Sequence, residues 1–195
     1  QALTEYDFIA VIDKSGSMGE TDMPGGKSRW AYMQETATAF VRDLSALDSD
    51  GLGLVLFSGA SIVSEDGVGV DRVKEIFANN RPSGSTPLAQ ALREALKLAG
   101  KSDKKDFIIV FTDGTPDDEQ AVKNVIIDAS KKQETDDALT ILFVQVGYDA
   151  AAKKYLSDLD DNLTGAKFDI VDAKTMEEAE KFPSTAELIL AAIAD

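Results

Sequence analysis

The sequence contains no cysteine and no histidine among its 195 residues. The absence of cysteine excludes disulfide bonds, thiolate nucleophiles and zinc fingers. The absence of histidine excludes every mechanism that needs an imidazole group. Missing disulfides also favour a reducing compartment, so we expect a cytoplasmic protein, with an extracellular or periplasmic location left open.

Positive charge is scarce. The chain has 20 lysine and arginine residues and 35 aspartate and glutamate residues, which gives a net charge of −15. Such a surface repels phosphate backbones and anionic membranes. We therefore expect neither a nucleic-acid partner nor a membrane partner. We expect most of these carboxylates to lie on a solvated surface.

Long hydrophobic runs are also missing, since no apolar stretch approaches the ~20 residues that span a bilayer. The sequence opens without the basic and apolar segments of a signal peptide. Hydrophobic residues still make up 44% of the chain, which suffices for a core. Because no linker, repeat or low-complexity stretch divides residues 1–195, we expect one domain, and a monomer.

Apolar runs alternate with helical patterns along the whole chain. Strands are expected at 6–13, 51–58, 61–64, 106–113, 138–147 and 167–172, and helices at 29–47, 70–80, 87–100, 117–132, 149–160 and 176–195. Only two residues separate the second and third strands, which favours an antiparallel edge hairpin, and Pro183 is expected to break the last helix. The pattern predicts an α/β fold: a Rossmann-like, doubly wound, mainly parallel six-stranded sheet with one short antiparallel edge strand and helices on both faces.

Oxygen-bearing side chains follow two of these strands. Asp13, Ser15 and Ser17 come after the first strand, and Asp113 comes after the strand at 106–113. In an open parallel sheet, ligands bind beyond the carboxyl ends of the strands, where the strand order reverses. If these two strands are central neighbours, Asp13 and Asp113 face each other across a crevice, and Thr86 is a further hydroxyl in the loop between them. Two carboxylates and three hydroxyls suit one hard divalent cation, Mg²⁺ first, with Mn²⁺ or Ca²⁺ as alternatives.

Each of these segments also has a purely structural interpretation. The stretch 13–17 is compatible with a helix cap or a turn, and Thr86 is compatible with a cap of the helix that begins at Pro87. The stretch "GGKS" (25–28) resembles the end of a phosphate-binding loop, but Thr21 stands where that loop needs glycine. We interpret 25–28 as a loop. Trp30 is expected in the core.

The motifs "DKSGSM" (13–18), "SGSTPL" (83–88) and "TDG" (112–114) together resemble the von Willebrand factor type A domain, in particular its bacterial members, with the metal-ion-dependent adhesion site of that family. The resemblance covers essentially the whole chain. It implies that Ser15, Ser17 and Thr86 touch the metal directly, while Asp13 and Asp113 act largely through water. It also implies that a partner protein supplies a glutamate or aspartate to the metal, without catalysis. The flanking residues expected to contact that partner are Lys14, Met18, Gly84, Ser85 and Gly114.

Two other functions stay open from the sequence. A Mg²⁺-dependent phosphoryl hydrolase would use the cation to polarise a phosphate, but Ser15 stands where the aspartate-nucleophile phosphatases usually carry a second aspartate. A structural or sensor domain would use the cation only to stabilise the fold. We expect an interaction module and no enzyme.

Overall fold

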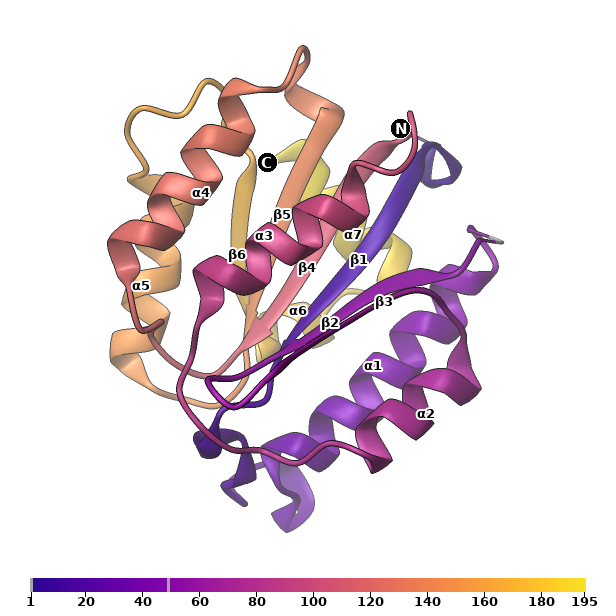
Figure 1. Cartoon of the computed structure of the whole chain (residues 1–195), viewed down its shortest axis with the longest axis vertical. Coiled ribbons are helices and arrows are strands. Elements are labelled where there is room, and N and C mark those ends of the chain that lie inside the picture. Colours follow the sequence, from indigo (N-terminus) through magenta and orange to yellow (C-terminus); the bar gives the residue numbers. More distant parts are fainter. Residues whose placement is uncertain (1, 49) are drawn as a thin grey trace.

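The computed structural model describes residues 2–48 and 50–195, and its centre is a six-stranded sheet with the order β3-β2-β1-β4-β5-β6. The strands are β1 Tyr6–Asp13, β2 Leu52–Phe57, β3 Ile62–Val68, β4 Lys105–Thr112, β5 Leu139–Gln145 and β6 Val171–Thr175. All neighbouring strands run parallel except β3, which pairs antiparallel with β2 at one edge. The predicted mainly parallel sheet with an antiparallel edge strand is confirmed (Figure 1).

Helices cover both faces of this sheet. They are α1 Arg29–Ser45, α2 Val70–Ala78, α3 Leu88–Ala99, α4 Glu119–Lys131, α5 Ala150–Asp161, α6 Met176–Glu180 and α7 Thr185–Ala194. The apolar sides of α3, α4 and α5 pack on one face, and those of α1, α2, α6 and α7 pack on the other. In Figure 1, α3 crosses in front of the central strands and α7 lies behind them. Within the described ranges, no helix has the length and apolar character needed to cross a membrane.

The central strands are apolar on both sides because both sides are covered. In β1, Phe8 and Ile12 belong to the core beneath α1, while Ile9 and Val11 belong to the core beneath α3. Successive side chains of a strand point to opposite faces, so a strand packed on both faces is a continuous hydrophobic run. This explains why the buried strands could be recognised from the sequence.

The two edge strands depart from the expected boundaries. The strand expected at 61–64 extends to Val68, and the one expected at 167–172 begins at Val171 and ends at Thr175. Glu65 and Asp66 continue β3 because an edge strand keeps one side in water and tolerates charged residues. The polar end of β6 has the same explanation. Edge strands therefore lack the apolar signal that marks the central ones.

The break expected at Pro183 is confirmed. The helix α6 ends at Glu180 and α7 begins at Thr185, and Ser184 caps α7 by accepting a hydrogen bond from the Glu187 amide at 3.2 Å. Proline lacks an amide proton and cannot continue a helix from the preceding turn. The chain uses this break to change direction between the end of β6 and the helix that covers β5.

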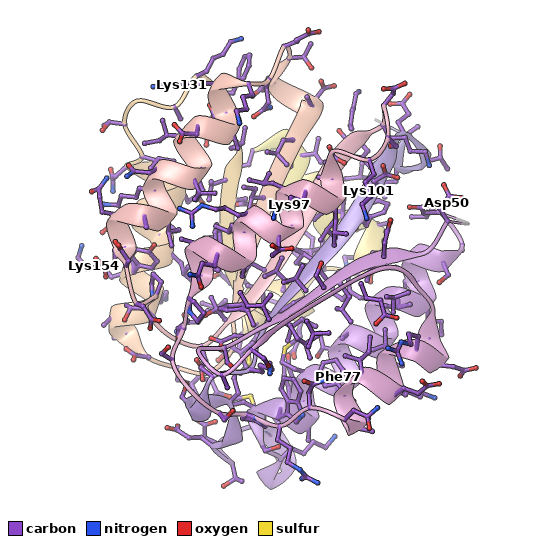
Figure 2. All side chains as sticks on the ribbon, in the orientation of Figure 1. Asp50, Phe77, Lys97, Lys101, Lys131 and Lys154 are labelled. Carbon is purple, nitrogen blue, oxygen red and sulfur yellow. The ribbon has the colours of Figure 1, made fainter. Side chains whose placement is uncertain are left out.

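Trp30 is only partly buried, although the sequence predicted a core position. Its ring centroid lies 4.5 Å from that of Phe77, which α2 contributes and Figure 2 labels. Trp30 thus packs over the edge of the core and not inside it. Farther out, Lys131 and Lys154 extend from α4 and α5 into solvent, as expected for the polar sides of amphipathic helices (Figure 2).

Asp106, near the amino-terminal end of β4, makes the stability of the folded state depend on pH. Its Oδ1 atom is buried and has no hydrogen-bond partner among the described residues. Burial, together with the charge of Asp7, raises the pKa of Asp106 to about 7. The pKa of an unfolded aspartate is about 3.9, so the folded state loses stability as the pH rises from ~4 through 7.

We predict that Asp106→Asn removes this pH dependence. The variant should unfold at a higher urea concentration than the unmodified chain at pH 8, because the neutral amide needs no ionisation in a buried place. At pH 4 the two proteins should unfold at nearly the same urea concentration. Urea titrations at both pH values measure the difference, and an equal gain at pH 4 and pH 8 would contradict the assignment.

Candidate metal centre

The sheet order reverses between β1 and β4, and both strands end in an aspartate. Asp13 is the last residue of β1, and Asp113 directly follows β4. The two strands are hydrogen-bonded parallel neighbours, as the sequence predicted. Both aspartates are buried, with exposed fractions of 0% and 3%. The carboxyl ends of β1 and β4 therefore bring two acidic groups to one point of the sheet edge.

Asp13 holds the first loop in place. Its Oδ1 accepts a hydrogen bond from the Ser15 amide at 2.7 Å, and its Oδ2 accepts one from the Thr112 hydroxyl at 2.9 Å. The turn interpretation of this stretch is thus correct for the main chain, and it leaves the serine hydroxyls available. Burial and the negative charge of Asp113 raise the pKa of Asp13 to about 6. A cation at this position would offset both effects.

Three oxygen atoms converge beside Asp13. The Oγ atoms of Ser15 and Ser17 are 3.3 Å apart, and the Ser17 hydroxyl donates to Asp113 Oδ1 at 3.0 Å. Neighbouring ligands in an octahedron with bonds of about 2.1 Å are about 3 Å apart. The spacing and the chemistry of this donor set fit a small divalent cation. Ser15 is buried and Ser17 is exposed, so the group opens to solvent on the Ser17 side.

The loop that carries Thr86 lies against the Ser15 turn. The Gly16 amide donates to the Gly84 carbonyl at 3.0 Å, which joins the two loops directly. Thr86 is fixed through its main chain, because its amide donates to Asp117 Oδ1 at 2.8 Å and its carbonyl accepts from the Asp117 amide at 2.9 Å. The structure therefore brings all three loops to the same edge and anchors Thr86 at both main-chain atoms.

Thr86 does not cap the following helix. Pro87 occupies the N-cap position of α3, and in the described part of the chain this end has no side-chain cap. Asp117 is the first residue of the helix expected at 117–132, but in the structure it precedes α4 and its side chain holds the Thr86 loop. The N-cap of α4 is the next residue, Asp118, which accepts a hydrogen bond from the Ala121 amide at 2.9 Å. Two adjacent aspartates look equivalent in sequence, and only the fold separates their roles.

Arg29 is the main residue of this region that the sequence did not indicate. Its Nη1 atom donates to Asp113 Oδ2 at 2.7 Å, and its Nε and Nη2 atoms donate to the two carboxylate oxygens of Asp22 at 2.9 and 2.6 Å. Nη2 also lies 3.0 Å from Glu20 Oε2. The side chain is 9% exposed, so a buried guanidinium touches one of the two acidic residues of the centre.

Two of the five residues expected to contact a partner are buried. Lys14 is 3% exposed and its Nζ donates to Ser61 Oγ, while Met18 is 0% exposed and packs in the core. The Lys14 amide still pairs with the Phe57 carbonyl at 2.8 Å, which continues the sheet and directs the side chain inward. Gly84 and Ser85 are exposed and Gly114 is half-buried. Of the five expected residues, these three present surface beside the centre.

The stretch 25–28 has a local role in this structure. Ser28 caps α1, because its Oγ accepts a hydrogen bond from the Ala31 amide at 3.0 Å. Lys27 Nζ pairs with Glu35 at 2.7 Å. These contacts agree with the loop interpretation of "GGKS" and use its serine and lysine within the chain.

A second acidic group lies at the β6 edge. Carboxylate oxygens of Asp160, Asp172 and Asp195 lie within 4.8 Å of one another. Burial and the charge of Asp195 raise the pKa of Asp160 to about 7, and Lys174 Nζ lies 3.3 Å from Asp172. Lys174 already supplies a positive charge to this group, and a cluster of carboxylates does not by itself define a metal site, so we assign no metal to it.

Comparison with known proteins agrees with this fold. The sequence matches the family description "von Willebrand factor type A domain" over residues 8–115, just over half of the chain. A search of curated proteins found no match.

Similar solved structures have low sequence identity. The SpRpn10 VWA domain superposes with a TM-score of 0.64 at 13% identity, covering 93% of this chain and 90% of that one. The manganese-loaded Plasmodium vivax TRAP protein gives 0.63 at 18% identity, covering 90% and 71%. The pilus adhesin SpaC from Lactobacillus rhamnosus GG gives 0.59 at 16% identity, covering 96% of this chain and 29% of that one. The sequence match and the shared fold agree: this chain belongs to the von Willebrand factor type A domain family.

Proposed function

We propose that the chain is a metal-dependent protein-interaction module with a metal-ion-dependent adhesion site of the bacterial type. The cation, Mg²⁺ first, is held by Asp13, Ser15, Ser17, Thr86 and Asp113. When bound, it supplies a Lewis-acid centre for a glutamate or aspartate carboxylate of a partner protein. The observation that carries the proposal is the spacing of 3.0 and 3.3 Å between the Ser15, Ser17 and Asp113 oxygens at the reversal of the sheet order.

The ligand types favour binding of an acid over chemistry on a substrate. Serine and threonine hydroxyls are neutral donors, so three of the five ligands add no negative charge to the ion. Ser17, Gly84 and Ser85 keep the site accessible to a protein surface. No histidine is available as a base, and Ser15 takes the position of a second aspartate. We therefore favour the interaction module over the phosphoryl hydrolase.

Two structural relatives support this function by analogy. The TRAP structure is described as manganese-loaded, and SpaC is described as a pilus adhesin. Both share the fold of this chain at less than 25% identity, so they contribute an analogy of fold alone.

We predict that Mg²⁺, Mn²⁺ or Ca²⁺ binds with a stoichiometry of one, and that Thr86→Ala abolishes capture of a partner. Calorimetric titration measures the first, and a pull-down from native lysate with and without chelator measures the second. Chelation should release the partner from the unmodified chain. The matched control is Thr164→Ala, an exposed threonine in the loop that precedes β6, which should retain the partner.

Each alternative predicts a different outcome. Calorimetry without heat for all three cations would end the proposal. If the Thr86→Ala chain unfolds in metal-containing buffer, the cation has a structural role. If metal binds and the partner is captured equally with and without chelator, the site serves something other than this interaction.

A further inference from the structure

The Arg29 side chain connects three segments around the centre. It donates to Asp22 in the loop after β1 and to Asp113 after β4. Its guanidinium also lies against the main chain at Gly147, after β5, where an added Cβ would come within 2.9 Å of Arg29 Cζ. Gly147 has a φ of 89°, a conformation that glycine adopts at low cost. The guanidinium is therefore enclosed by three loops and fixed in orientation.

The two oxygen atoms of Asp113 have separate partners. Oδ1 accepts the Ser17 hydroxyl at 3.0 Å, and Oδ2 accepts Arg29 Nη1 at 2.7 Å. A charge-assisted bond of this length between buried groups is stronger than a neutral hydrogen bond. A direct bond from Oδ2 to a cation would need to displace the guanidinium. Arg29 thus keeps one side of this carboxylate away from the centre.

Arg29 also changes the net charge of the side chains around the proposed cation. Asp13 and Asp113 alone would neutralise a divalent cation, whereas the guanidinium leaves one positive charge in excess. Glu20 and Asp22 partly offset this excess, but their side chains are 59% and 38% exposed, and water screens exposed pairs strongly. The Asp113 side chain is 1% exposed, so its pair with Arg29 acts most directly on the site.

We propose that Arg29 is a positioning residue that neutralises Asp113 and holds its Oδ2 atom off the cation, so that the site binds metal less tightly and the partner's carboxylate more tightly. This inference rests on the proposed function. The opposite changes of the two affinities have a physical basis. Each negative charge withdrawn from the cation weakens the protein's own binding of the metal and strengthens the attraction of the metal for an incoming anion. Arg29 would then set how the site divides its affinity between metal and partner.

The test measures two affinities in Arg29→Gln. Titration of Mg²⁺ alone should show about tenfold tighter binding than in the unmodified chain. Titration of acetate into the Mg²⁺-saturated protein, followed by NMR shifts, should show about tenfold weaker binding. Arg29→Lys keeps the positive charge and should bring both values back to within about threefold. The matched control is Arg72→Gln, which removes a guanidinium from the exposed Glu65 and Glu75 pairs and should change neither affinity.

A second variant covers the case in which Arg29→Gln fails to fold. Asp22→Asn removes the outer partner of the guanidinium and should strengthen its hold on Asp113, which weakens Mg²⁺ binding and strengthens acetate binding. Thermal unfolding in chelator reports any purely structural loss separately. Opposite shifts of the two affinities support the inference, and shifts in the same direction, or none, overturn it. Failure of the unmodified chain to bind Mg²⁺ would overturn the proposed function itself.

Discussion

Asp13→Asn is expected to weaken Mg²⁺ binding by at least ~100-fold, the largest change in metal affinity that we predict. A unit charge about 4 Å from a monovalent ion contributes about 4 kcal/mol at an effective dielectric constant of 20, and twice that for a divalent ion. A third of this energy already corresponds to ~100-fold in affinity. Asparagine keeps the shape and the Oδ1 atom that accepts the Ser15 amide, so the loop should keep its conformation. Calorimetric titration with Mg²⁺ measures the loss.

The stability of the Asp13→Asn variant shows whether it loses Mg²⁺ affinity through the lost charge or through unfolding. Burial and the Asp113 charge raise the pKa of Asp13, so the ionised form is costly in the metal-free protein. In chelator, Asp13→Asn should unfold at the same temperature as the unmodified chain or at a higher one. Asp106→Asn is the matched control, since it neutralises another aspartate of the central strands at the opposite end of the sheet. Equal loss of Mg²⁺ affinity in the two variants would contradict a site at Asp13.

Gly147→Ala is expected to lower the free energy of unfolding by about 2–4 kcal/mol, the largest stability effect that we predict. A left-handed backbone conformation costs a non-glycine residue about 1–2 kcal/mol, and Gly147 has a φ of 89°. The new Cβ would also lie 2.9 Å from the Arg29 guanidinium, whose displacement would disturb a buried ion pair. Urea unfolding in chelator measures the change.

Gly114→Ala is the matched control for this substitution. Gly114 belongs to a loop at the same edge of the sheet, and a Cβ there would meet nothing within 4 Å. Surface substitutions without a clash change the free energy of unfolding by about 0.5 kcal/mol or less. If Gly114→Ala and Gly147→Ala cost the same, then the contact of Gly147 with Arg29 has no energetic role.

The sheet and the position of the centre could be predicted because they depend on short stretches of sequence. A strand buried on both faces is a continuous apolar run, and a ligand site of a parallel sheet follows its strands. Asp13 and Asp113 each follow such a run, so topology alone places them together. The bounds of the edge strands β3 and β6 differ from those expected, because charged residues such as Glu65 and Lys174, which are half-buried, interrupt the apolar run.

Arg29 shows what a sequence without a structure does not reveal. Its contacts are with Asp22, seven positions away, and Asp113, 84 positions away, and neither spacing has a local signature. Arg29 is the first residue of the helix expected at 29–47, but a helical pattern does not show which of its charged side chains is buried. Lys14 was missed for the same reason, because its Ser61 partner is 47 positions away across the sheet. Burial of charged side chains depends on which loops meet, and loops meet only in the folded chain.

The strand β3 has a consequence for self-association. It forms one border of the sheet, where a strand of another copy could otherwise add by main-chain pairing. Glu65, which Arg72 holds through two hydrogen bonds, and Asp66 both lie on this border. A strand of another copy would have to desolvate these charged side chains before it formed main-chain hydrogen bonds with β3. This edge therefore disfavours fibril-like extension of the sheet into neighbouring copies.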